Sequence, residues 1–236
     1  MDNGIFKFKK FNVFHSKSSM KVGVDGVLIG AWANDKGKKI LDVGTGCGLI
    51  ALMLAQRNGE ALIDAIDIDE KSVDEAGLNF ENSMWSERLR CMKADFRDWC
   101  KDNKLKYDLI VSNPPYYSSG VVPSGRRMTA RHQGALSPWV IIEESEKILN
   151  ENGRIAMIMP NEIFNQLSRN INHTPFRIDR ICKVRRSIDH PYKRIMIELT
   201  KSNSSSVTIE YLTMFDKSGE PTDAYRELCK DFYLKF

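Results

Sequence analysis

From about residue 39 onward, short apolar runs alternate with longer stretches in which apolar residues recur every three or four positions. The short runs predict buried strands and the longer stretches predict amphipathic helices. The expected strands cover residues 39–43, 62–67, 90–95, 107–112 and 154–159, and the expected helices cover 49–57, 70–82 and 137–150. Right-handed crossovers between such units give a parallel sheet whose strands end at one common edge.

The pattern changes after Pro160. Residues 176–184 and 194–200 alternate polar and apolar positions across a short connection, which favours an antiparallel pair at the edge of the sheet. Residues 207–215 allow one more strand, and 222–236 predict a terminal helix with one apolar face.

The expected fold is therefore α/β, a Rossmann-like, doubly wound, seven-stranded and mostly parallel sheet with an antiparallel strand pair at one edge. With 236 residues, of which 42% are hydrophobic and 28% charged, the chain fits an ordinary globular protein with a sizeable core. We expect one domain over residues 1–236, in which 1–36 cover the cofactor and 37–236 form the catalytic sheet and helices.

The sequence shows no pattern typical of a targeting signal or a metal site. No apolar run reaches the roughly 20 residues that cross a bilayer, and no apolar stretch follows the N-terminal charges, so we expect a cytoplasmic protein. The four histidines lack metal-ligand spacing, and no metal is expected. The cysteines form no C-x-x-C pair and predict buried free thiols; they are Cys47, Cys91, Cys100, Cys182 and Cys229.

A glycine-rich loop follows the first predicted strand, with Gly44, Gly46 and Gly48 in G-x-G-x-G spacing. Glycines let the backbone turn sharply and approach a ligand closely. Leu49 stands where a dinucleotide-binding loop has its third glycine, so the NAD fingerprint is not met. Asp42 precedes the loop, where it would repel a pyrophosphate but suit the ammonium of a methionine moiety. The loop therefore favours S-adenosylmethionine as the cofactor.

Acidic residues also end the next two predicted strands. Asp67 is placed to accept hydrogen bonds from ribose hydroxyls, with Asp69 as the alternative, although a helix N-cap is the favoured role for Asp69. Asp95 is placed to accept from the adenine amino group, and Phe96 to contact the adenine through its backbone and by packing.

The sequence Asn113-Pro114-Pro115-Tyr116 follows the fourth predicted strand. Consecutive prolines fix φ and remove N–H donors, which holds the backbone carbonyls rigidly outward. The side-chain oxygen of Asn113 and the carbonyl of Pro114 suit the two N–H groups of a planar amino group, and Tyr116 suits stacking on its ring. These features predict methyl transfer to an amino nitrogen conjugated to a ring. The alternative is that the tetrad is a rigid surface turn without a catalytic role.

With these motifs, the chain resembles class I amino-methyltransferases, and more closely the bacterial tRNA1(Val) adenine-37 N6-methyltransferases. The resemblance rests on residues 6–15, 20–32, 42–48, 113–116 and 224–234, with Val24 departing from an expected threonine. It implies N6-methylation of a tRNA adenine, and closure of residues 20–26 over the methionine end of the cofactor. Lys21 is then placed to pair with the cofactor carboxylate, or is simply solvated, and Gly23 and Gly26 would permit a tight turn.

Two basic clusters favour a polyanionic substrate. Residues 118–134 lie just beyond Tyr116, have no strand or helix period and carry three arginines and His132. A second cluster is predicted on the antiparallel strand pair. The residues expected to contact RNA phosphates are Arg126, Arg127, Arg131, Arg185 and Arg186, although solvated basic faces are the alternative. The expected partner is tRNA, and a monomer is the expected state.

Three other functions use the same features. A protein-glutamine N5-methyltransferase shares the tetrad, but such enzymes generally carry an N-terminal helical domain, and only about 38 residues precede the first sheet strand. Amino methylation of another RNA or DNA base is the second. The third is a non-catalytic RNA-binding module with structural S-adenosylmethionine, against which an intact Asn113 and Tyr116 argue.

Overall fold

A computed structural model describes residues 4–18, 21–115, 136–202 and 206–236. Its centre is one sheet in which every strand runs in the same direction except β9. The strands, in order across the sheet, are β10 (Thr208–Thr213), β8 (Arg177–Arg185), β9 (Arg194–Thr200), β7 (Leu149–Pro160), β6 (Tyr107–Ser112), β3 (Lys39–Val43), β4 (Leu62–Asp67) and β5 (Leu89–Lys93).

This sheet confirms the predicted α/β class and the antiparallel pair, which is β8 and β9. It has eight strands rather than seven, because residues 207–215 do form the additional strand, β10. β10 pairs with β8 in parallel, so β10 and not the antiparallel pair occupies this edge of the sheet. A separate hairpin of β1 (Ile5–Lys7) and β2 (Asn12–Phe14) was not predicted.

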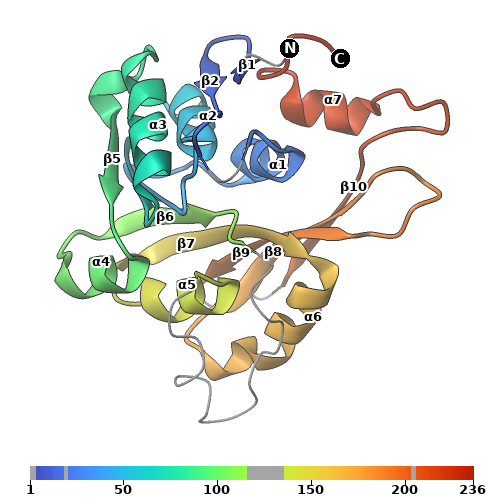
Figure 1. The fold of residues 1–236 in the computed structure, drawn as a ribbon. Helices are drawn as coiled ribbons and strands as arrows, with labels where there is room; N and C mark the ends of the chain where they lie inside the picture. Colours follow the sequence, from blue (N-terminus) through green and yellow to red (C-terminus); the bar gives the residue numbers. More distant parts are fainter. Residues whose placement is uncertain (1–3, 19–20, 116–135, 203–205) are drawn as a thin grey trace.

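Helices cover both faces of the sheet, as Figure 1 shows. One face carries α1 (Val24–Trp32), α2 (Leu49–Arg57), α3 (Glu70–Glu81) and α7 (Asp223–Cys229), and the other carries α4 (Phe96–Asp102), α5 (Pro138–Ser145) and α6 (Asn161–Asn170). Short 3₁₀ turns lie at η1 (Ser86–Arg88) and η3 (Ile171–His173). Two buried apolar clusters fill the space on the two faces. Among the described residues, no helix is both long and apolar enough to cross a bilayer.

The first helix packs closely on the second through two glycines. A Cβ at Gly26 would lie 3.1 Å from Leu49 Cδ2, and a Cβ at Gly30 would lie 2.8 Å from Met53 Sδ. Gly26 is therefore a buried helical residue that lets α1 approach α2, and the tight turn predicted for it is wrong. Close packing fixes where the first turn of α1 lies.

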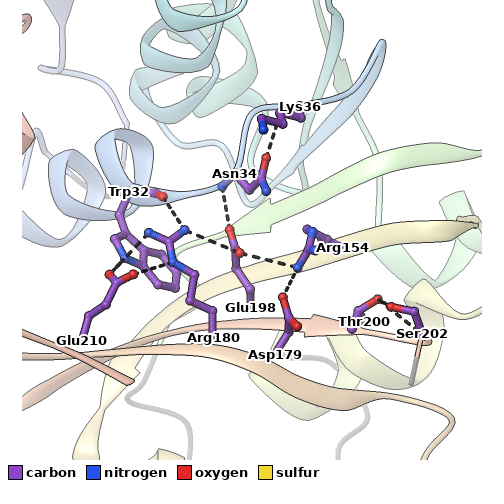
Figure 2. Close-up of polar contacts among 10 residues, drawn as sticks. All are labelled: Trp32, Asn34, Lys36, Arg154, Asp179, Arg180, Glu198, Thr200, Ser202 and Glu210. Carbon is purple, nitrogen blue, oxygen red and sulfur yellow. Dashed lines mark hydrogen bonds and ion pairs between the residues drawn. The ribbon is translucent and has the colours of Figure 1, made fainter. Parts of the chain in front are cut away.

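A buried polar network holds the other end of α1 on the sheet (Figure 2). The indole Nε1–H of Trp32 donates to Glu210 at 2.7 Å, and the backbone N–H of Asn34 donates to Glu198 at 2.6 Å. The Arg180 guanidinium lies 4.1 Å from the Trp32 ring centroid and also pairs with Glu210. Burial raises the pKa of Glu198, which is only 1% exposed, although Arg180 is 3.6 Å away. Arg180 thus serves the fold rather than a substrate.

Candidate active site

The glycine loop and Asn113 lie side by side where the sheet reverses its strand order. β3 pairs with β4 on one side and with β6 on the other, and the Ser112 hydroxyl donates to the Val43 carbonyl at 2.7 Å. Open parallel sheets bind their ligands at the carboxyl ends of strands at this kind of switch point. Two cavities open here, and Gly44, Gly46 and Asn113 line both of them.

The first, which we call the β4–β5 cavity, has a volume of about 290 Å³ and lies at the ends of β4 and β5. Its lining combines carboxylates with apolar groups, among them Asp67, Asp69, Asp95, Phe96 and Leu136. The second, the α1 cavity, has a volume of about 320 Å³ and lies against the first turn of α1. Its charged lining residues are Lys21, Asp25 and Arg194.

The end of β4 holds the glycine loop in shape. Asp67 accepts from the Gly46 N–H at 2.9 Å through one oxygen and from the Asp69 N–H at 3.0 Å through the other. Gly44 and Gly46 have φ of +70° and +56°, a region that side chains disfavour and glycine adopts freely. The loop backbone is therefore positioned before any ligand arrives.

Asp69 and Asp95, which follow β4 and β5, cap the N-termini of helices. Asp69 caps α3 by accepting from the backbone N–H of Ser72 at 3.1 Å, which confirms the N-cap predicted for it. Asp95 caps α4 by accepting from the Arg97 N–H at 2.8 Å through Oδ1, and it still lines the β4–β5 cavity. Asp95 thus has the helix N-cap role that was the alternative for each of these aspartates, in addition to its place in the cavity lining.

Asp42 and Gly48 lie behind the loop and line neither cavity. Asp42 is completely buried, and its Oδ2 accepts from the Thr45 hydroxyl at 2.7 Å and from the Ala51 N–H at 3.2 Å. Burial raises the pKa of Asp42 to about 7, against the lowering effect of these two bonds. Gly48 is required by packing, because a Cβ there would lie 2.5 Å from the Phe80 ring. We assign both residues to support of the loop.

Two polar residues on α3 hold the N-terminal segment beside the cavities. Asn79 accepts from the Phe14 N–H and donates to the carbonyls of Phe14 and Cys47, each at 2.8 Å. Glu75 accepts from the backbone N–H groups of Lys17 and Ser18 at 2.8 and 2.7 Å. Burial alone would raise the pKa of Glu75, but these bonds outweigh it and the pKa lies below its usual value.

The first turn of α1 is also tied to the sheet. Arg194, at the start of β9, donates to Asp25 at 2.7 Å, and both residues line the α1 cavity with Lys21. None of these partners of the N-terminal segment was predicted. The signal was weak, because Glu75 and Asn79 look like ordinary polar positions of an amphipathic helix, and Arg194 looks like one member of a basic run.

The structure thus gathers seven of the predicted cofactor-binding residues at the two cavities: Lys21, Gly44, Gly46, Asp67, Asp95, Phe96 and Asn113. Pro114 follows Asn113 and is buried, whereas Arg185 and Arg186 lie at the end of β8. Tyr116, Arg126, Arg127 and Arg131 lie outside the described residues. Among the residues that are described, no group of three or more His, Cys, Asp or Glu side chains could hold a metal ion.

A family model for the methyltransferase small domain matches residues 7–173. The chain belongs to this methyltransferase family. It is 40% identical over 240 residues to a tRNA1(Val) (adenine(37)-N6)-methyltransferase from Parabacteroides distasonis, and the match covers 100% of both chains. A protein of the same name from Photobacterium profundum is 37% identical, with 98% of each chain covered.

Solved structures support the fold of this methyltransferase. A predicted O-methyltransferase from Agrobacterium tumefaciens has a TM-score of 0.66 at 16% identity, covering 88% of this chain and 96% of that one. A putative RNA methyltransferase from Pyrococcus horikoshii has a TM-score of 0.55 at 13% identity, covering 80% and 89%. At these identities the likeness shows a Rossmann-like methyltransferase fold.

The lining residues fit S-adenosylmethionine. The β4–β5 cavity offers Asp67 and Asp95 to hydroxyl and amino groups, and Phe96 to a flat ring. The α1 cavity offers the Lys21 ammonium to a carboxylate. The two cavities meet at Gly44, Gly46 and Asn113. Three carboxylates, those of Asp67, Asp69 and Asp95, and one guanidinium, that of Arg97, line the first cavity. Its net negative charge suits an uncharged adenosine and opposes a pyrophosphate.

Proposed function

We propose that this methyltransferase transfers the methyl group of S-adenosylmethionine to the N6 amino group of an adenine in tRNA, at position 37 of tRNA1(Val). The observation that carries the proposal is the place of Asn113, which lines both cavities at the end of β6 beside the glycine loop. An amide at this point is within reach of the junction between the two halves of the bound cofactor. The acceptor is supported by relatives of that name at 34–40% identity that match over nearly the full chain.

The cofactor lies with its adenosine in the β4–β5 cavity and its methionine moiety in the α1 cavity. Asp67 accepts from the ribose hydroxyls, Asp95 accepts from the adenine amino group through the oxygen that does not cap α4, and Phe96 packs on the ring. Lys21 pairs with the carboxylate. Asp42 acts through the loop, by holding Thr45 and the start of α2 in place.

The chain's own residues prepare the acceptor nitrogen. When bound, S-adenosylmethionine supplies an electrophilic methyl carbon on a sulfonium and departs as a neutral thioether. The side-chain oxygen of Asn113 and the carbonyl of Pro114 accept the two N–H bonds of the adenine amino group and direct its lone pair at that carbon. The N–C bond forms as the C–S bond breaks, and the nitrogen then loses its extra proton to water. Orientation therefore provides most of the acceleration.

The basic residues fit a tRNA substrate. Arg185 and Arg186 stand at the end of β8, at the same edge of the sheet as Asn113, where they suit contacts with phosphates. Tyr116 is assigned to stacking on the adenine, and Arg126, Arg127 and Arg131 to phosphate contacts. Since tRNA is used in the cytoplasm, we propose that the enzyme acts there.

Radiolabelled methyl transfer to total tRNA, DNA and protein from cells lacking the gene tests this function. We expect label in tRNA alone, and N6-methyladenosine after digestion to nucleosides. Label in protein would support glutamine methylation instead, and label in DNA would support another base. Cofactor binding without any transfer would favour a non-catalytic RNA-binding module.

A further inference from the structure

A group of aromatic and basic side chains lies on and beside β8 and β10, the strands at one side of the sheet. We call it the tyrosine patch, and its members are Lys183, Arg185, Arg186, Tyr192 and Tyr211. The ring centroids of Tyr192 and Tyr211 are 5.5 Å apart with the planes at 59°. The Arg185 guanidinium carbon lies 4.9 Å from the Tyr192 centroid, and Lys183 Nζ lies 5.9 Å from the Tyr211 centroid.

Strand alternation places Lys183, Arg185 and Tyr211 on one face, ring contacts place Tyr192 beside them, and Arg186 directly follows Arg185. In the parallel pair of β8 and β10, Lys183 is opposite Tyr211 and Arg185 is opposite Thr213. The residues between them, including Val184 and Leu212, point to the other face and join the core. This face of the edge strand β10 is open to solvent, since Tyr211 is 61% exposed and its neighbour Ile209 is 50% exposed. Exposed apolar side chains on an edge strand are a liability unless they serve a partner.

The basic side chains of the patch have no carboxylate partner among the described residues. Within the described parts of the chain, Lys183, Arg185 and Arg186 form no ion pair, whereas Arg180 pairs with Glu210 and Arg194 with Asp25. Among the residues that the structure describes, Arg185 donates to two neutral oxygens, the Thr213 hydroxyl at 2.8 Å and the Ile188 carbonyl at 3.1 Å. These bonds fix its guanidinium over the Tyr192 ring without neutralising its charge. An unneutralised set of cations around exposed rings suits a polyanion that carries flat rings.

The patch borders the candidate active site. β8 and β10 run in the same direction as β3 and β6, so all four end at the same edge of the sheet. Arg194, which follows Tyr192 by two residues, lines the α1 cavity. The Lys193 N–H donates to the Val184 carbonyl at 3.1 Å, which ties this connection to the end of β8. A substrate that reaches Asn113 can therefore extend onto the patch.

We propose that the tyrosine patch binds single-stranded nucleotides of the tRNA that adjoin the target adenine. A base stacks on the exposed ring of Tyr211, and Tyr192 supports that ring from the side while Arg185 holds Tyr192 in place. Lys183 and Arg186 contact phosphates. This inference rests on the proposed function. Stacking of this kind is sequence-tolerant because every base has a flat face, so the patch holds the loop while the site at Asn113 selects the base.

Steady-state kinetics with tRNA and cofactor varied separately test the stacking role. Tyr211→Ala should raise the KM for tRNA by about tenfold, within the range seen when a base loses an aromatic partner. The KM for S-adenosylmethionine and the thermal midpoint should not change. Tyr211→Phe keeps the ring and should behave as wild type. Leu62→Ala is the matched control, because Leu62 is 51% exposed but stands at the start of β4, on the opposite edge of the sheet.

Salt dependence tests the phosphate contacts. The logarithm of the tRNA association constant falls with log salt by about 0.7 for each phosphate contacted in a single-stranded region, and Lys183→Ala should reduce the slope by about that amount. An unchanged KM for tRNA in Tyr211→Ala, together with an unchanged slope in Lys183→Ala, would overturn the patch while leaving the proposed function standing. A change of oligomeric state in Tyr211→Ala without an effect on tRNA would also overturn it, in favour of a protein interface.

Different results would refute the proposed function and the role of the tyrosine patch. Failure of the wild-type enzyme to methylate any tRNA would refute the proposed function. In that event the tRNA dissociation constants of the same variants, measured directly, still decide whether the patch binds RNA. Equal dissociation constants for wild type, Tyr211→Ala and Lys183→Ala would refute it.

Discussion

The side-chain amide of Asn79 joins the Cys47 carbonyl in the glycine loop to the backbone of Phe14 in the N-terminal hairpin, with each bond at 2.8 Å. Asn79 is 1% exposed, so water cannot replace these bonds. A residue of α3 thus couples the segment that precedes α1 to the glycine loop.

Asn79→Ala should therefore weaken cofactor binding as well as the fold. It removes the partner of the buried Cys47 carbonyl and two bonds to the half-buried backbone of Phe14, and a buried group left without a partner costs about 1–3 kcal/mol. We expect a lower free energy of unfolding in urea and a several-fold higher dissociation constant for S-adenosylmethionine by calorimetry. Asn82→Ala is the control, because Asn82 is exposed at the end of the same helix and its side chain donates to the Leu78 carbonyl within that helix. If both variants bind the cofactor equally well, the coupling is refuted.

Gly30→Ala should destabilise the protein despite the better helix propensity of alanine. The new Cβ would lie 2.8 Å from Met53 Sδ and 3.2 Å from Met53 Cβ in the contact between α1 and α2. Overpacking of a buried contact costs about 1–3 kcal/mol, more than the roughly 1 kcal/mol gained in propensity. Gly77→Ala in α3 should instead stabilise, since no atom lies within 4 Å of its added Cβ. Urea unfolding of both variants checks this, and the same sign for both would contradict it.

The strands that position the site were predictable, because β3, β6 and the second half of β7 are buried on both faces and appear as nearly continuous apolar runs. Three helices were missed for physical reasons. α1 contains Gly26 and Gly30, which favour turns in an isolated sequence but permit close helix packing here. α4 has only seven residues, too few for a clear period, and α6 follows Pro160, where the strand pattern ends.

The site was predictable where function depends on position along a strand. Asp67 ends β4, Asn113 directly follows β6, and Asp95 lies two residues after β5, so the topology alone brings them together. Asp42 ends the same way but is covered by α2, whose Ala51 N–H it accepts, and only the packed structure shows this. Glu75 and Asn79 depend on the path of the N-terminal segment, which the period of α3 does not encode.

The pKa of Asp42, raised by burial from 3.8 to about 7, makes stability depend on pH. In the unfolded chain the carboxyl gives up its proton near its ordinary pKa, so the folded state loses stability as pH rises from about 4 to about 7. Asp42→Asn cannot titrate, and its amide oxygen keeps the bonds from Thr45 and Ala51. We expect the free energy of unfolding of wild type, minus that of the variant, to fall between about pH 5 and 7 and to level off above about pH 8. A difference that stays constant over this range would contradict the buried, proton-binding role.

The central claim is that Asn113 directs an adenine amino nitrogen of tRNA at the methyl group. The most direct test is nucleoside analysis by mass spectrometry of tRNA treated with wild type or Asn113→Ala in the presence of S-adenosylmethionine. We expect N6-methyladenosine with wild type and a rate at least about 100-fold lower with the variant, while the cofactor dissociation constant changes far less. Formation of N6-methyladenosine by Asn113→Ala at the wild-type rate, or a methyl group at another position of the base, would contradict it.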